Sequence, residues 1–324
     1  MMKILYISSG HRRIYEFFDR SIIRSFRKLS IQFAIHHPAA PISSLADTLR
    51  QFHPDFVLAM LGDKISFDVL KWIKKSNLPS VLWLTEDPYY LKKTIRYAHF
   101  FDFLFTIDRF SVEWYQKQGI KNVYYLPLGT DLTVFRPKPV DSSFKSDLCL
   151  IGYPYENRKK LIDLLIKETP YYIQLVGLWK MDVPKRSKHR VSIHQGWISP
   201  SAVSCYYNGA FININTLRPI DDPHNETVAN IGIRSLNNRT FDIAACSSFQ
   251  LAERSDDLNE FFTEDKDIAS FSSLEEAVEK IDHYMPLAMD RERISKNGHS
   301  KVVMRDTFED RVKQILQTIN IQAD

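Results

Sequence analysis

Short apolar strands and amphipathic helices alternate along this chain, and the alternation occurs twice. The first series extends over residues 3–125 and the second begins at residue 147. The segment 127–146 between them contains three prolines and little apolar periodicity, which is typical of an interdomain linker. Strand–helix alternation predicts parallel strands covered by helices on both faces. We therefore expect an α/β protein with two doubly wound parallel-sheet lobes and a cleft between them, where such folds bind their ligands.

The expected elements follow from the periodicity of the apolar residues. In the first lobe we expect strands at 3–8, 31–35, 55–60, 80–84, 103–107 and 123–125, and helices at 12–28, 41–52, 67–76, 89–96 and 111–118. In the second lobe we expect strands at 147–151, 173–176, 191–194, 211–214, 249–252 and 268–271, and helices at 158–167, 200–207, 239–246, 258–262, 274–285 and 308–319. The expected domains are a first lobe at 1–138, a second lobe at 139–305, and a C-terminal segment 306–324 that crosses back to the first lobe.

Charge is divided unevenly between the two lobes. Residues 1–138 carry 20 Lys and Arg against 12 Asp and Glu, a net charge of +8, and the rest of the chain carries a net charge of −4. A basic lobe predicts peripheral contact with an acidic partner or surface. Its basic helix 12–28 has interleaved apolar residues, which also fits packing against a sheet.

Several protein classes are excluded by the composition. No apolar run is long enough for a transmembrane segment, and residues 1–3 lead directly into a strand, so we expect no signal peptide. Cys149, Cys205 and Cys246 lie far apart in sequence, which predicts reduced thiols in a cytoplasmic protein.

The acidic pair 221–222 lies in a proline-flanked loop, and we expect no metal there. Neither a Walker A loop nor a GxGxxG run is present, which argues against P-loop and dinucleotide-binding enzymes.

The segment 232–246 carries the most ligand-binding chemistry. Three residues with good capping side chains open its helix: Asn237, Asn238 and Thr240. Such a helix start directs backbone N–H groups and a positive dipole end towards a ligand. Arg239 adds a phosphate partner, and Asp242 offers two oxygens to sugar hydroxyls. The combination suits the diphosphate and ribose of a nucleotide, and it also fits a capped helix with a surface arginine.

The order of several short motifs resembles that of GT-B glycosyltransferases. In the first lobe these are the strand 103–108, LPLGTD at 126–131 and FRP at 135–137. In the second lobe they are LIG at 150–152, VG at 176–177, QGW at 195–197, FININ at 211–215 and the helix 239–246. Over nearly its whole length the chain is similar to the CgeB/YkvP-type, glycosyltransferase-like proteins of spore maturation.

The resemblance implies transfer of a sugar from a nucleotide-diphosphate sugar, foremost a UDP-sugar, to a glycan or surface-protein acceptor. It implies neither a metal nor a permanently bound cofactor. The donor-binding residues that it implies are Gly152, Arg158, Trp197, Asn237, Arg239, Thr240 and Asp242. Of these, Arg158 is expected at the diphosphate and Trp197 at the base, although an exposed helix start and a buried indole would explain them equally well.

Two acidic positions of related enzymes differ in this chain. Where relatives have a Glu that holds the ribose, this chain has Asp242, and where they have a second Glu eight residues earlier, it has Arg234. The second difference argues against the retaining chemistry of that group. The same difference leaves open a second possibility, namely a protein of the spore surface that binds a nucleotide sugar but has little turnover. An enzyme of this fold acting on an anionic polymer is the third possibility, which the basic first lobe permits.

Sugar transfer needs a base for the acceptor hydroxyl and cations for the leaving diphosphate. His11 follows the first strand and Gly10, where the resemblance implies a catalytic His, and Glu86 and Asp87 follow the fourth strand. We predict that Asp87 or His11 is the base and that Glu86 orients it. The same residues also fit a loop and a plain helix N-terminus. The resemblance further implies a location in the mother-cell cytoplasm or at the spore surface.

Overall fold

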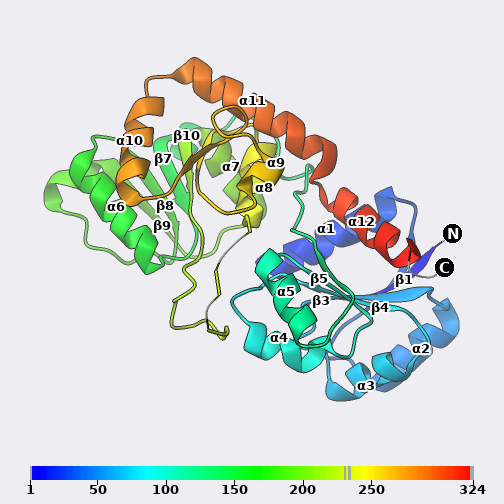
Figure 1. The fold of residues 1–324 in the computed structure, drawn as a ribbon. Helices are drawn as coiled ribbons and strands as arrows, with labels where there is room; N and C mark the ends of the chain where they lie inside the picture. The colour runs from blue at the N-terminus through cyan, green and yellow to red at the C-terminus, as the bar shows by residue number, and fades with distance from the viewer. Residues whose placement is uncertain (1, 230, 233–234, 322–324) are drawn as a thin grey trace. The chain divides into compact units, whose positions relative to one another are not determined.

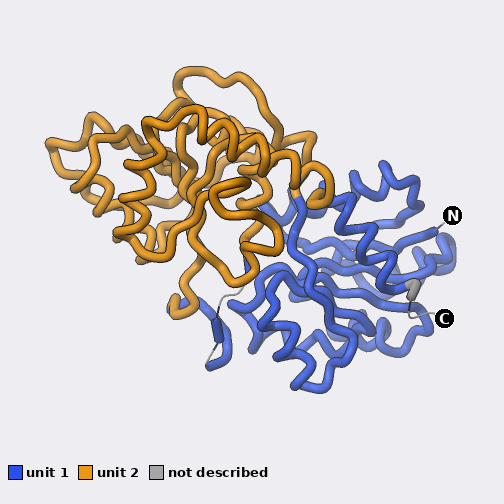
Figure 2. The backbone as a smooth tube through the Cα atoms, turned by 45° about the horizontal axis from the view of Figure 1, so that its top comes forward, with its two compact units in different colours: residues 1–129, 223–235, 308–324 blue, residues 130–222, 236–307 orange. Residues whose placement is uncertain are grey.

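The computed structural model describes residues 2–229, 231–232 and 235–321 and divides the chain into two compact units (Figures 1 and 2). Unit 1 comprises residues 1–129, 223–235 and 308–324, and unit 2 comprises residues 130–222 and 236–307. Each unit contains one six-stranded sheet, in which every strand pair is parallel. The expected α/β class with two parallel-sheet units is therefore confirmed.

The sheet of unit 1 has the strand order β2-β1-β3-β4-β5-β6. Its strands are β1 (Lys3–Ile7), β2 (Gln32–His36), β3 (Phe56–Met60), β4 (Ser80–Leu84), β5 (Phe103–Thr106) and β6 (Val123–Tyr125). Its helices are α1 (Ile14–Lys28), α2 (Ile42–Phe52), α3 (Phe67–Lys75), α4 (Leu91–Ala98), α5 (Arg109–Lys117) and α12 (Phe308–Ile321).

Alternating side chains of β1 build the two cores of unit 1. Ile4 and Tyr6 pack with α1 and α12 on one face, whereas Leu5 and Ile7 pack with α2, α3, α4 and α5 on the other (Figure 1). This alternation follows from the two-residue period of a strand. The apolar side of the basic helix α1 is thus buried against the sheet, and contact of its exposed basic side with an acidic partner stays a prediction.

The sheet of unit 2 has the strand order β12-β11-β10-β7-β8-β9. Its strands are β7 (Ser146–Ile151), β8 (Ile173–Gly177), β9 (Val191–Gln195), β10 (Ala210–Asn215), β11 (Gln250–Glu253) and β12 (Ala269–Phe271). Its helices are α6 (Glu156–Glu168), α7 (Pro200–Gly209), α8 (Asn238–Ala245), α9 (Leu258–Phe261), α10 (Leu274–Tyr284) and α11 (Ala288–Arg305), with 3₁₀ turns at Ser142–Phe144 and Lys185–Arg190. Helices α6 and α10 pack on one face of the sheet, and α7 on the other.

The units differ from the expected domains in two places. Unit 2 begins at Thr130, not at residue 139, because Thr130 bridges Thr307 and donates its N–H to the Asp306 carbonyl. The stretch 223–235 belongs to unit 1 since Val228 and Ile231 pack against its apolar core. The final helix α12 also groups with unit 1.

Helix α11 lies in a stretch where the sequence suggested no element. It extends over Ala288–Arg305 and buries only Ile294, Ser295, Gly298 and Val302. Gly298 allows the close approach, because a Cβ there would lie 2.5 Å from the Asp267 carbonyl oxygen. Within the described residues, no helix is both long and apolar enough to cross a membrane.

The strand order determines where each sheet can bind a ligand. In unit 1 the order reverses between β1 and β3, and in unit 2 between β7 and β10. In open parallel sheets the connections diverge at such a reversal and leave a crevice at the carboxyl ends of the two strands. The residues that follow β1 and β3 in unit 1, and those that follow β7 and β10 in unit 2, therefore lie where a ligand would bind.

Candidate functional site

Two arginines flank Gly152 at the carboxyl end of β7. A Cβ at this glycine would lie 2.6 Å from Nη1 of Arg158 and 3.2 Å from Nη1 of Arg239. The backbone φ of Gly152 is +144°, a conformation that side-chain-bearing residues rarely adopt. The neighbouring Gly177 is constrained as well, because a Cβ there would collide with the Gly152 carbonyl oxygen. Gly152 thus leaves room for both guanidinium groups, and Gly177 leaves room for the backbone of Gly152.

Arg158 connects the loop after β7 to the end of β10. Its Nε donates to Thr216 Oγ1 at 2.6 Å, its Nη2 to the Thr216 carbonyl at 3.0 Å and its Nη1 to the Tyr153 carbonyl at 2.8 Å. The side chain is 2% exposed, and its guanidinium lies over the Tyr155 ring. Arg158 therefore carries a buried positive charge at the reversal point.

Arg239 and Asn237 hold the start of α8 to the same strand end. Arg239 donates to Asn215 Oδ1 at 3.2 Å and to the Thr216 carbonyl at 2.8 Å. Asn237 Nδ2 donates to Asn215 Oδ1 at 3.0 Å, and the Asn237 side chain makes no cap hydrogen bond to the helix. Its buried Oδ1 has no hydrogen-bond partner within the described part of the chain. Such an orphan acceptor is unusual in a folded protein and suits a ligand donor group.

Thr240 and Asp242 point into unit 2. Thr240 is 1% exposed, and its Oγ1 accepts a hydrogen bond from Asn215 Nδ2 at 2.9 Å. Asp242 is 5% exposed, and its two oxygens accept from Thr130 Oγ1 at 2.8 Å and Asn238 Nδ2 at 3.1 Å. Burial raises the pKa of Asp242 to about 8, although these two hydrogen bonds act to lower it. Both oxygens of Asp242 are thus engaged inside unit 2, where the charge of Arg239 also acts to lower its pKa, and its role at a ribose stays a prediction.

The pH dependence of stability tests the burial of Asp242. An unfolded Asp has a pKa of about 3.9, so the folded protein binds this proton more tightly, and the free energy of unfolding falls as the pH rises from about 4 to about 8. Asp242→Asn mimics the protonated carboxyl and should weaken that fall. Calorimetric Tm values should show a difference between variant and wild type that grows with pH. Parallel pH profiles would contradict the assignment.

Trp197 lies away from the arginines. It follows β9, the edge strand two positions from β7, and is 50% exposed. Tyr153 and Leu178, which follow the glycines that end β7 and β8, are 48% and 53% exposed. Three neighbouring strands therefore end in a glycine followed by an exposed apolar side chain. The three exposed side chains lie at the carboxyl ends of their strands, where open parallel sheets bind ligands. Of the three, only Trp197 was predicted from the sequence to contact a ligand.

A pocket of about 210 Å³ opens at the carboxyl ends of β1, β3 and β4 in unit 1. It is lined by His11, Tyr15, Leu61, Asp63, Leu84, Glu86, Tyr90, Lys93, Thr94 and Tyr97. The strand reversal between β1 and β3 explains why His11 and Asp63, 52 residues apart in sequence, meet here. The structure thus brings His11 and Glu86 to one pocket.

Asp63 binds two side chains, His11 and Lys93, in this pocket. His11 Nε2 lies 3.0 Å from Asp63 Oδ1, and Lys93 Nζ lies 3.0 Å from Oδ2. Burial acts to raise the pKa of Asp63, but the hydrogen bonds from His11 and Lys93 outweigh it and lower the pKa overall. Asp63 therefore remains ionised and fixes one ring nitrogen of His11. Sequence reasoning missed both Asp63 and Lys93.

Glu86 and Asp87 have different surroundings although they are adjacent in sequence. Glu86 accepts a hydrogen bond from the Tyr15 hydroxyl at the pocket, and the Tyr15 ring lies 5.3 Å from that of His11. Asp87 is 1% exposed and accepts from Thr106 Oγ1 at 2.8 Å. Burial raises the pKa of Asp87 to about 7. The carboxyl of Asp87 is enclosed and lines no part of this pocket, and its role as the base stays a prediction.

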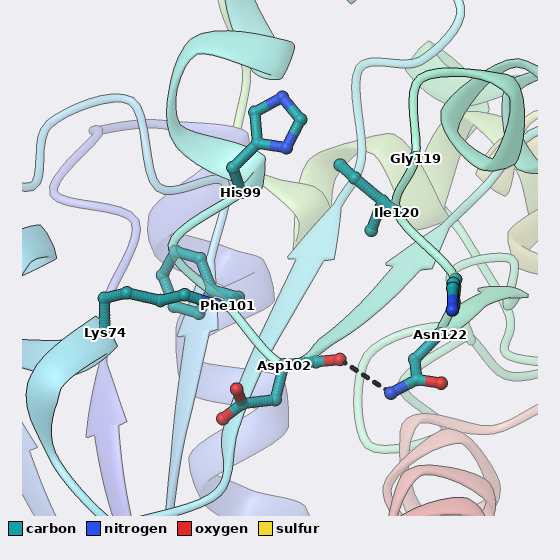
Figure 3. Close-up of a pocket in the computed structure, with 8 residues that line it drawn as sticks. Lys74, His99, Phe101, Asp102, Gly119, Ile120 and Asn122 are labelled. Atoms are coloured by element: carbon teal, nitrogen blue, oxygen red, sulfur yellow. Dashed lines mark hydrogen bonds between the residues drawn. The ribbon is translucent and has the colours of Figure 1, made fainter.

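A second cavity of unit 1 lies at the opposite edge of the sheet (Figure 3). It measures about 340 Å³ and lies at the amino ends of β5 and β6. Lys74 lies in the last turn of α3, where a cation stabilises the negative end of the helix dipole. His99 is the residue that follows α4.

Two further expectations concern metals and Arg234. Among residues 2–229, 231–232 and 235–321 there is no cluster of three or more His, Cys, Asp or Glu side chains placed to hold a metal ion. Asp222 of the acidic pair lies 3.9 Å from Arg218. Arg234 lies outside the described residues.

The sequence matches a known family and a curated protein. A family model described as "Glycosyl transferase-like" matches residues 158–317. The chain is 32% identical to spore protein CgeB of Bacillus subtilis (strain 168) over 312 residues, which cover 95% of this chain and 96% of that protein.

Several solved structures share the fold at low sequence identity. The α-glucosyltransferase AGT, bound to UDP and a 13-mer DNA, has a TM-score of 0.70 and 12% identity, covering 98% of this chain and 99% of that one. Sucrose-phosphate synthase from Thermosynechococcus elongatus has a TM-score of 0.69 and 10% identity, covering 99% of both chains. Anabaena HepE in complex with UDP-glucose has a TM-score of 0.65 and 14% identity, covering 99% of this chain and 100% of that one. These likenesses show the two-lobed GT-B fold.

Proposed function

This chain belongs to the CgeB family of glycosyl transferase-like proteins, and we propose that it transfers a sugar from a nucleotide-diphosphate sugar to a hydroxyl of a glycan or surface-protein acceptor. In this scheme unit 2 binds the donor, and unit 1 binds the acceptor and carries the base. Kinship to a spore protein favours action in the mother-cell cytoplasm or at the spore surface.

The observation that carries the proposal is the pair of arginines beside Gly152 at the start of α8. Guanidinium groups bind phosphate oxygens bidentately, and the first N–H groups of a helix favour an anion. The part-buried Arg239 offers its guanidinium to phosphate oxygens, and the buried Arg158, whose three nitrogens already donate to Thr216 and Tyr153, adds its positive charge. The proposed chemistry therefore uses no metal. The orphan Oδ1 of Asn237 offers an acceptor to the nucleoside, and the exposed Trp197 offers a stacking face to the base. UDP-sugars are the proposed donors because two fold relatives are complexes with UDP or UDP-glucose.

The proposed base is His11. Its Nε2 is bound to Asp63, so Nδ1 is the ring nitrogen that would take the proton from the acceptor hydroxyl. Asp63 fixes the tautomer and stabilises the imidazolium that forms, which is the role of a carboxylate paired with a general base. Asp63 thereby takes over the orienting role that the sequence suggested for Glu86.

A thermal-shift panel of UDP-, GDP-, TDP- and CDP-sugars tests donor binding. At about 100 times the Kd, a ligand that binds only the folded state raises the free energy of unfolding by about 2.7 kcal/mol. We expect a UDP-sugar to produce this stabilisation and the other bases to produce less. A flat response across the panel would contradict the proposal. UDP release in the presence of an acceptor then separates an enzyme from a binding protein with little turnover.

A further inference from the structure

The pocket of unit 1 carries an inference about the acceptor, which rests on the proposed function. We propose that this pocket binds one uncharged sugar ring, so that the acceptor is the end of a neutral glycan and not an anionic polymer.

The volume limits the ligand to a small one. The cavity measures about 210 Å³, whereas sites for drug-sized ligands measure roughly 300–1,000 Å³. One six-membered ring with its hydroxyl groups fits this scale. A stretch of polymer would have to continue outside the pocket, with only its terminal unit inside.

The charges of the pocket disfavour an anion. Its two nitrogen-bearing side chains, His11 and Lys93, both bind the same carboxylate, Asp63, at 3.0 Å. The second carboxylate, Glu86, adds a negative charge and accepts a hydrogen bond from the hydroxyl of Tyr15. A phosphate, sulfate or uronate group would therefore meet two acidic side chains, while His11 and Lys93 are already engaged by one of them. Like charges in a partly buried site repel with little screening.

The wall suits sugar hydroxyls and C–H groups. Carboxylates accept hydrogen bonds from hydroxyl groups, and hydrogen bonds to a charged acceptor are the stronger ones. The rings of Tyr15, Tyr90 and Tyr97 line the same space, and tyrosine combines an apolar face with a polar tip. Leu61 and Leu84 complete the wall. Such a mixture of acidic, aromatic and aliphatic side chains recognises a polyhydroxylated ring better than a purely apolar or purely charged group.

Binding by saturation-transfer NMR tests this proposal with the full chain. The probes are the methyl glycosides of glucose, galactose, N-acetylglucosamine and rhamnose, together with methyl glucuronide and glucose 6-phosphate, at millimolar concentration. We expect at least one neutral glycoside to bind and both anionic probes to fail. Glu86→Gln should weaken the neutral ligand by at least about tenfold through loss of a charge-assisted hydrogen bond. The matched control Lys74→Met, in the cavity of Figure 3, should have no effect.

Asp63→Asn tests the exclusion of anions more directly than Glu86→Gln does. It removes the carboxylate that engages Lys93 and His11, so methyl glucuronide should now bind. Binding of an anionic probe to the wild type in preference to all neutral glycosides would overturn the proposal, as would the absence of binding by any neutral glycoside. Arg239→Ala should keep glycoside binding even if donor binding is lost. If no nucleotide sugar stabilises the protein but a neutral glycoside still binds, the proposed function is contradicted and the proposal for this pocket is not.

Discussion

Replacing His11 with alanine is expected to lower kcat for sugar transfer by about 10²–10⁴-fold, the usual contribution of a general base. The acceptor hydroxyl would then have to lose its proton without Nδ1 of the imidazole ring that Asp63 orients through Nε2. The affinity for the nucleotide should not change, because His11 belongs to unit 1 and the proposed donor residues belong to unit 2. Release of UDP from a UDP-sugar, measured with and without acceptor, checks the turnover.

His99→Ala is the matched control for this prediction. His99 lines the cavity at the opposite edge of the same sheet (Figure 3), so its removal should leave kcat unchanged. Asp63→Asn should lower kcat less than His11→Ala does, since the imidazole remains but loses its orientation. Retained turnover in His11→Ala would remove His11 from the mechanism. The enclosed Asp87 would then have to be reconsidered as the base.

Replacing Arg239 with alanine is expected to weaken UDP binding by about 1.5–3 kcal/mol, the worth of a hydrogen bond to a charged group. This corresponds to an increase in Kd of roughly 10- to 150-fold. The reason is that Nη1 of Arg239 lies beside Gly152 at the edge where β7 meets the start of α8. Titration calorimetry with UDP measures the change directly.

Two further variants show whether a change in UDP affinity in Arg239→Ala comes from a lost contact with the ligand. Arg186 is an exposed arginine of the same unit, and Arg186→Ala should bind UDP like the wild type. Arg239 also donates to the Thr216 carbonyl, so Arg239→Lys and a circular-dichroism melt show whether the loss reflects ligand contact or local unfolding. Unchanged affinity in a folded Arg239→Ala protein would place the donor elsewhere.

Much of the fold could be predicted from periodicity. The strands at 80–84 and 123–125 lie where the apolar pattern puts them. The first of these is fully buried, and such strands need continuous apolar runs. Helix α11 escaped prediction because only four of its residues are buried, and its packing depends on the absence of a side chain at Gly298. The inclusion of 223–235 in unit 1 depends on two apolar residues in an otherwise irregular stretch.

The candidate site was predictable only in part. Glycines at strand ends and an arginine at a helix start are local signals, and they led to Gly152 and Arg239. Asp63 and Lys93 carry no local signal, because strand order alone brings them to His11. The inward orientation of Asp242 depends on Thr130, which is 112 residues away in sequence. Donor binding is therefore assigned to the two arginines beside Gly152, and not to an acidic residue at the ribose.

The central claim is that unit 2 binds a nucleotide at the carboxyl ends of β7 and β10. Amide hydrogen exchange with and without UDP tests it most directly, because it reports protection residue by residue. If UDP binds at these strand ends, amide exchange should slow in the loop that follows Gly152 and in the first turn of α8. Exchange around the pocket that contains His11 should not change. Protection confined to unit 1, or none at all at saturating UDP, would contradict the central claim.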